Sequence, residues 1–283
     1  MDVGRKRDFA EAVNYVEDLY PNMAVLSQLA NYLDDPNSSL DNVVGLIRAE
    51  PALTVDIIKI SNSSFYASTQ KCSDVDTALT RIGFNEVLRV VALILAKELC
   101  SSDLEKYGVT ADDLWTESLM VSLLMEEFAR DSKMNKSKAA TLGILHCIGR
   151  VVINNILEDF RVDIYWDPTI PVVDWEEAVV GFHYGEAGGR LLKKLEFPTE
   201  ALQVIRYHVN PKEASKPDRM TYLLNYSVNL SNVVGRGFIN SSYELPDDEY
   251  LAKVGEFSEK AIREIVKTAQ DRFLEVTNEV FAQ

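Results

Sequence analysis

Cysteine and histidine are scarce in this sequence, and acidic residues outnumber basic ones. Three cysteines occur among 283 residues, at Cys72, Cys100 and Cys147, without the paired spacing of a disulfide framework or a zinc knuckle. The 29 lysines and arginines against 44 aspartates and glutamates give a formal net charge of −15. Because phosphate neutralisation needs a basic face, this balance argues against nucleic acid as a partner.

Long apolar runs are also lacking. The longest uninterrupted one covers residues 90–96, whereas a membrane-spanning helix needs about twenty residues. Basic residues near the N-terminus are not followed by an apolar run, so a secretory signal is not expected. We therefore expect a soluble, cytoplasmic protein without a membrane partner.

Two common catalytic motifs are absent from the sequence: the G-x-x-x-x-G-K-[ST] phosphate loop and the G-x-S-x-G nucleophile elbow. His146 precedes Cys147, but adjacent helical positions do not face each other, so a nucleophile–base pair is not expected. His146, His183 and His208 lie on three separate predicted helices. They could converge on a metal ion or satisfy core hydrogen bonds, and their spacing alone leaves both readings open.

The sequence is rich in the 3.6-residue period of amphipathic helices, and few stretches alternate with period two. Pro51 fits the first turn of one helix, and Thr110 with Asp113 predicts a capping box at the start of another. The almost wholly apolar residues 84–99 predict a helix buried on more than one side. Further helices are predicted over 138–157, 175–183 (opened by a capping box of Asp174 and Glu177), 186–196, 198–208, 218–234 and the last 25 or so residues. The predicted fold class is all-α.

A polar stretch at 101–109 supplies the internal boundary of the chain. It divides an N-terminal helical half, 1–105, from a second helical half, 106–235, with a C-terminal helical extension at 236–283. Whether the two halves fold independently stays open.

Short motifs along the chain resemble those of HDOD domains. They lie at residues 20–23, 35–40, 47–54, 60–63, 78–83, 142–150 and 206–211. Their order and spacing agree with the family over roughly residues 18–235. The resemblance implies an all-α fold in which an N-terminal helical subdomain precedes an HD-like helical bundle. It also implies kinship with the HD phosphohydrolases and the HD-GYP cyclic-dinucleotide phosphodiesterases.

In those catalytic relatives, His and Asp side chains hold metal ions that activate water for attack on a phosphoester. The resemblance places the family's ligand positions at Glu117, His146, Cys147, His183, His208 and, least securely, Asn232. The lysine of the family's H-D-x-G-K run is Arg150 here, which would keep a basic group for a phosphate.

Three of these positions depart from the catalytic pattern of the relatives. Glu117 stands where the relatives have a histidine, which keeps a possible ligand but changes its charge. A thiolate at Cys147 cannot offer two hard oxygens to Mg²⁺ or Mn²⁺, and the neutral amide of Asn232 is a weak ligand. A binuclear hydrolytic centre is therefore not expected. A single zinc, iron, nickel or manganese ion held by Glu117, His146, His183 and His208 stays open. We favour the alternative, in which these groups hydrogen-bond one another in a relict pocket without a cofactor.

The resemblance implies a non-catalytic bacterial signalling module that binds a protein partner or a small ligand. The alternative is a metal-dependent phosphohydrolase acting on a nucleotide or another phosphoester. A third possibility is a phosphorylated ligand held without turnover, with Arg150 and Arg206 as anchors. The acidic balance would steer the chain toward basic partners. The long C-terminal helix could pack on the domain, which we favour, or pair two copies as a homodimer.

Overall fold

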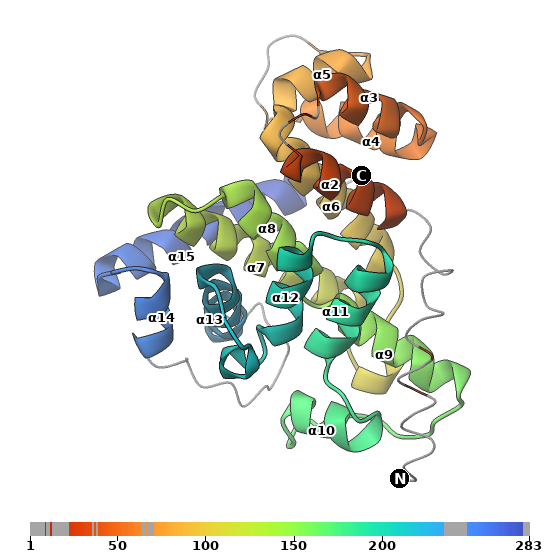
Figure 1. Ribbon diagram of the computed structural model, residues 1–283, viewed down its shortest axis with the longest axis vertical. Helices are drawn as coiled ribbons and strands as arrows, with labels where there is room; N and C mark the ends of the chain where they lie inside the picture. The colour runs from red at the N-terminus through yellow and green to blue at the C-terminus, as the bar shows by residue number, and fades with distance from the viewer. Residues whose placement is uncertain are drawn as a thin grey trace.

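The computed structural model describes Phe9, Ala12 and residues 23–35, 37, 39–63, 66, 71–234 and 248–279 (Figure 1). Its regular structure is helical, and these residues contain no strand beyond an isolated bridge between Leu104 and Val109. The predicted all-α class is therefore confirmed. Most of the motif expected at 20–23, and the predicted boundary at 235/236, lie outside the described residues.

The N-terminal half consists of α2 to α6, with α3, α4 and α5 grouped at the top of Figure 1. Its helices are α2 (Met23–Asp34), α3 (Leu40–Arg48), α4 (Pro51–Ser61), α5 (Val75–Ile82) and α6 (Phe84–Leu99). Pro51 opens α4 as predicted. Gly83, with φ of 90°, joins α5 directly to α6, and this left-handed backbone is one that glycine adopts at little cost.

The second half is built around α7, whose side chains are buried on nearly every side. Its helices are α7 (Ala111–Asp131), α8 (Lys136–Leu145), α9 (Ile148–Asp159), α10 (Val172–Val179), α11 (Tyr184–Lys194), α12 (Thr199–Tyr207) and α13 (Arg219–Val233). The predicted capping box at the start of α7 is present, because Thr110 and Asp113 each accept a hydrogen bond from the other's backbone N–H. Two further helices, α14 (Asp248–Val254) and α15 (Glu259–Glu279), follow, and α15 packs along α7.

The connection between the two halves coincides with the predicted polar boundary, since α6 ends at Leu99 and α7 begins at Ala111. A short 3-10 helix, Glu105–Tyr107, occupies this connection. The two halves nevertheless share one hydrophobic core, because α6 packs against α2 on one side and α8 on the other. This explains why α6 is apolar nearly all round.

Two of the helix predictions were wrong. The single helix predicted over 138–157 is two helices, and α8 gives way to α9 at His146 and Cys147. His146 therefore lies at a junction and not within a helix. The capping box predicted at Asp174 is also wrong, because Pro171 is the residue that precedes the first turn of α10. Its fixed φ, here −51°, suits entry into a helix at Val172.

The stretch Lys136–Asp159, which contains α8 and α9, is long and apolar enough to cross a membrane by length and composition. However, 94% of its most apolar window is buried inside the protein. Burial of this kind is typical of a core helix in a soluble protein, and it agrees with the predicted solubility.

Candidate functional site

A cluster of polar side chains lies in the core where α8 meets α9. It consists of Glu117 on α7, His146 at the end of α8, Arg150 on α9, Tyr184 on α11 and His208 at the end of α12. We refer to these five residues as the Glu117 cluster. None of the five is more than 1% exposed. A site this deeply buried is closed to solvent in the observed conformation.

The centre of the cluster is an ion pair. Arg150 Nη1 donates to Glu117 Oε2 over 2.6 Å, and the guanidinium lies over the Tyr184 ring, 4.2 Å from its centroid. On its other side, Glu117 Oε1 lies 3.7 Å from His146 Nε2. One buried carboxylate thus faces two basic groups.

Backbone carbonyls fix the tautomers of both histidines. His146 Nδ1 lies 2.7 Å from Gly143 O, and His208 Nδ1 lies 2.7 Å from Ile205 O. Because a carbonyl oxygen only accepts, each Nδ1 must carry a proton. The Nε2 atom of His146 therefore points to Glu117, while that of His208 accepts from the Tyr184 hydroxyl at 3.1 Å.

The charges of the cluster follow from these contacts. Burial raises the pKa of Glu117, but Arg150 and His146 lower it by a larger amount. The net shift of the pKa is downward, so the carboxylate is charged. Burial lowers the pKa of His146, but the facing carboxylate of Glu117 outweighs it and the net shift is upward. Burial and the nearby charge of His146 hold the pKa of His208 well below its usual value, so His208 is neutral.

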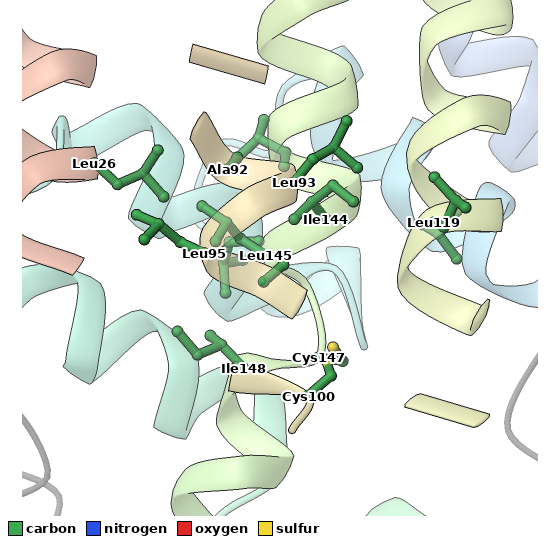
Figure 2. Packing of buried hydrophobic residues seen from close by; sticks show 14 of the residues in the cluster. Leu26, Ala92, Leu93, Leu95, Cys100, Leu119, Ile144, Leu145, Cys147 and Ile148 are labelled. Atoms are coloured by element: carbon green, nitrogen blue, oxygen red, sulfur yellow. The ribbon is translucent and has the colours of Figure 1, made fainter. Parts of the chain in front are cut away.

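The side chain of Cys147 lies beside those of Ser118 and Cys100. Its Sγ lies 2.8 Å from Ser118 Oγ, and Figure 2 shows its side chain next to that of Cys100 at the end of α6. The neighbouring Cys100 thiol and the charge of His146 lower the pKa of the Cys147 thiol against the effect of burial. The position where the catalytic relatives have a bridging carboxylate is thus occupied by a thiol that packs on α6 and α7.

Three of the predicted site residues have hydrogen-bond or ion-pair partners outside the cluster. His183 precedes α11, where its Nδ1 accepts from the backbone N–H of Glu186 at 3.2 Å. Arg206 is half-buried and lies 3.4 Å from the carboxylate of Glu186. Asn232, on α13, donates to Val228 O. Within the described residues, no hydrogen bond or ion pair connects these three side chains to Glu117.

The residues present do not fit the metal ion that the family resemblance implies. Across the described ranges, no group of three or more His, Cys, Asp or Glu side chains is arranged to hold a metal. The Arg150 guanidinium already neutralises Glu117, and a fixed positive charge at 2.6 Å disfavours a second cation. Two donor atoms, Glu117 Oε1 and His146 Nε2, face each other without a third ligand beside them.

Two residues of this region were missed by sequence reasoning, Tyr184 of the cluster and Glu176 beside it. Glu176 on α10 is fully buried and accepts from the Tyr107 hydroxyl at 2.9 Å and from the Tyr184 backbone N–H at 2.7 Å. Burial raises the pKa of Glu176 to about 8, although the charge of Arg150 acts in the opposite direction. The sequence carries a signal for this burial, because Val172 and Val179 stand four residues before and three residues after Glu176 on the same helical face.

Fold and cluster together define an all-helical domain with an ion pair sealed in its core. The HDOD domain profile matches residues 19–211, and the chain belongs to the HDOD family.

Solved structures with the same fold have low sequence identity to this chain. An HDOD domain protein of unknown function from Geobacter sulfurreducens aligns with a TM-score of 0.71 at 17% identity, covering 92% of each chain. A "Putative signal transduction protein" from Marinobacter aquaeolei VT8 aligns with a TM-score of 0.71 at 19% identity, covering 97% of this chain and 65% of the other. A "Putative phosphohydrolase" from Shewanella amazonensis SB2B aligns with a TM-score of 0.67 at 18% identity, covering 93% and 96%.

A protein of Treponema pallidum (strain Nichols), described as uncharacterized, is 24% identical over 274 residues. The match covers 93% of this chain and 51% of that protein, so the chain spans about half the length of this relative.

Proposed function

We propose that this chain is a non-catalytic HDOD signalling module of the bacterial cytoplasm, which acts by binding a protein partner or a small ligand. The observation that carries the proposal is the buried ion pair of Arg150 and Glu117. A guanidinium takes the place of the cation that a hydrolytic HD site would bind. Two structural relatives are named for the two candidate functions, signal transduction and phosphohydrolysis. The buried ion pair supports the first of these functions for this chain.

Hydrolysis by a metal ion requires several ligands and an open coordination position for water or substrate. The Glu117 cluster offers two donor atoms that face each other, and it is closed to solvent. The Cys147 thiol contacts Ser118 in place of a bridging carboxylate. These features support a structural role for the cluster in this chain.

The same geometry bears on phosphate binding. Arg150 is 0% exposed, paired with Glu117 and stacked on Tyr184, so an incoming ligand has no access to it. The Arg206 side chain is partly exposed and keeps the potential to bind an anion. We therefore place any ligand of the module outside the Glu117 cluster. A basic protein partner and a homodimer both remain compatible with the acidic charge balance.

The test is a hydrolysis assay on protein purified without a histidine tag. p-Nitrophenyl phosphate and bis-p-nitrophenyl phosphate are offered with Mn²⁺, Fe²⁺, Ni²⁺ or Zn²⁺, beside a folded His146→Ala variant. We expect no turnover above that of the variant. Metal-dependent turnover in the wild type that disappears in His146→Ala, and also in Glu117→Gln, would contradict the proposal.

One observation favours the alternative, a metal-dependent phosphohydrolase. Glu117 Oε1 and His146 Nε2 are buried and lack a hydrogen-bond partner in the described part of the chain, as partial ligand sets do. Restoring the family's pattern with Cys147→Asp, Arg150→Lys and Asn232→Asp together tests for a decayed site. If Mn²⁺-dependent hydrolysis appears only in this triple variant, the chain descends from an enzyme and is inactive in its present form.

A further inference from the structure

Two of the three cysteines lie side by side where the N-terminal half meets the second half. Cys100 follows the last turn of α6, and Cys147 precedes the first turn of α9. Both are free thiols, and Figure 2 shows their side chains next to each other in the core. Each thiol is also the largest single influence on the pKa of the other, as expected of groups in contact. Two free thiols in this arrangement are a candidate site for disulfide formation.

The positions of the two cysteines favour such a bond. A disulfide joins Cβ atoms roughly 3.8 Å apart, so side chains that already lie together need little movement to form one. Cys100 ends α6, and Cys147 occupies the short junction between α8 and α9. Neither backbone is therefore held by helical turns on both sides, and each can make the small adjustment that the bond requires.

The polar contact of Cys147 also tolerates the loss of its proton. Ser118 Oγ lies 2.8 Å from Leu114 O and 2.8 Å from Cys147 Sγ. Because a carbonyl oxygen only accepts, the Ser118 hydroxyl donates to Leu114, and the Cys147 thiol donates to the hydroxyl oxygen. Oxidation removes the thiol proton and keeps the bond from Ser118 to Leu114. The disulfide would thus leave no buried donor without an acceptor at this contact.

The burial of the pair limits the size of the oxidant. Cys100 is 7% exposed and Cys147 is 3% exposed. Cys100 is followed directly by the exposed residues Ser101 and Ser102, in the connection between α6 and α7. The pair therefore lies close to the surface on this side. A molecule as small as hydrogen peroxide could reach it from there.

We propose that Cys100 and Cys147 form a modification site at which hydrogen peroxide produces a reversible disulfide. The sulfur of one thiolate attacks a peroxide oxygen, the O–O bond breaks, hydroxide leaves, and a sulfenic acid forms. The sulfur of the second cysteine attacks the sulfenic sulfur, the S–S bond forms, and water leaves. In sum, two thiols lose two electrons and two protons, and one hydrogen peroxide becomes two water molecules. A dithiol reverses the reaction by thiol–disulfide exchange.

The disulfide would connect the N-terminal half to the junction that carries His146. Cys147 follows His146 in the sequence, and its contact Ser118 follows Glu117. The bond would therefore form directly beside the two facing residues of the Glu117 cluster. In the cytoplasmic location proposed above, disulfides are typically transient and redox-sensing.

This inference goes beyond the proposed function, because the disulfide depends neither on hydrolysis nor on a binding partner. The two can fail separately, since one is tested by turnover and the other by peptide mass and stability.

The test maps the disulfide in the full chain. Reduced protein is freed of reductant, treated with hydrogen peroxide, alkylated with iodoacetamide in denaturant and digested with trypsin without reduction. We expect a linked pair of peptides, residues 98–106 and 139–150, that dithiothreitol separates. Cys72, whose thiol contacts Ser61, should remain alkylated. Cys100→Ser should abolish the linked pair, and Cys72→Ser is the matched control that should retain it.

A second measurement tests whether the bond fixes α6 to the start of α9. A disulfide stabilises a protein mainly by constraining its unfolded chain. Peroxide should therefore raise the midpoint of thermal unfolding of the wild type by about 4 °C or more, and dithiothreitol should reverse the shift. Cys100→Ser should show no such gain, and Cys147→Ser replaces it if that variant does not fold.

Three results would overturn the proposal. The first is a peroxide-treated wild type in which all three cysteines are still alkylated. The second is a linked peptide that contains Cys72, or a sulfinic acid at Cys147 without a link to Cys100. The third is a linked pair without a gain in stability, which would show that the bond does not constrain the two halves.

Discussion

At the scale of single residues, the main feature of the core is that the charges of Arg150 and Glu117 compensate each other. Each is buried, and neither charge would be tolerated alone. The stacking of Arg150 on Tyr184 and the approach of His146 to Glu117 add to this compensation. The ion pair thus explains how these buried charges are tolerated in an apolar core.

Breaking this ion pair on one side should destabilise the protein strongly. Arg150→Met or Glu117→Leu leaves a buried charge without its partner, and we expect each to lower the free energy of unfolding by about 3–5 kcal/mol. The double variant removes both charges and should recover most of the loss. Urea unfolding of the four proteins measures this. Single variants as stable as the wild type would show that the ion pair is not formed.

Glu176 should make stability depend on pH. Its pKa is raised to about 8 by burial, while Tyr107 and Arg150 face it and Glu177 lies beside it. A carboxyl whose pKa is higher in the folded state than in the unfolded state binds its proton preferentially when folded. Stability should therefore fall as pH rises from the ordinary carboxyl range to about 8.

The matched control for this effect is Glu176→Gln. The variant keeps a hydrogen-bonding side chain but cannot ionise, so its stability should vary less over the same interval. Chemical unfolding at a series of pH values measures the difference. Parallel profiles for the two proteins would refute the assignment.

At the scale of helices, the site is positioned by the close contact between α9 and α11. A Cβ placed on Gly149 would lie 1.8 Å from the backbone oxygen of Tyr184. Only glycine allows the two helices to approach to this distance. The contact holds Arg150, the next residue, against the Tyr184 ring.

Gly149→Ala should therefore push α9 away from α11. We expect a loss of about 3 kcal/mol or more, because the neighbouring atom belongs to the backbone and cannot rotate away. Gly45→Ala is the control, since it lies within α3 with nothing within 4 Å of its Cβ position. That substitution should stabilise the protein by up to about 1 kcal/mol. Thermal unfolding measures the change in stability of each variant. Similar changes for Gly149→Ala and Gly45→Ala would argue against the close contact.

The C-terminal helix α15 is held to α7 by Arg272. This side chain lies 2.6 Å from Glu127 Oε1 and 3.0 Å from Glu126 Oε2, and both carboxylates are buried. Arg272→Met should lower the free energy of unfolding by about 1–3 kcal/mol and speed amide hydrogen exchange in residues 259–279. Arg263→Met, which breaks an exposed pair with Glu259, should change neither. Slow exchange in both variants would show that apolar contacts alone secure α15.

At the scale of the whole molecule, helical periodicity was enough to predict the fold class and most helices. It failed at His146 and Cys147, because the apolar residues Leu145 and Ile148 continue the helical pattern across the break. The pairing of Glu117 with Arg150 joins residues 33 positions apart on different helices, and periodicity carries no information on such partners. Both the helix break at His146 and Cys147 and the pairing of Glu117 with Arg150 depend on tertiary packing.

The structure brings together only some of the residues that the family resemblance named. Glu117, His146 and His208 lie together, whereas the side chains of His183, Arg206 and Asn232 bond to other groups. The difference arises because a motif position keeps its place on a helix, while the direction of its side chain depends on the neighbours present in this chain. Here the carboxylate of Glu117 turns to Arg150, and the imidazole of His183 caps α11.

The claim that an internal guanidinium replaces a metal ion is tested most directly by elemental analysis. Protein without a histidine tag is purified in the absence of chelators, beside the His146→Ala/His183→Ala double variant, and both are analysed for zinc, iron, nickel and manganese. The account predicts metal far below one ion per chain in both proteins. Close to one ion per chain in the wild type, lost in the double variant, would contradict it.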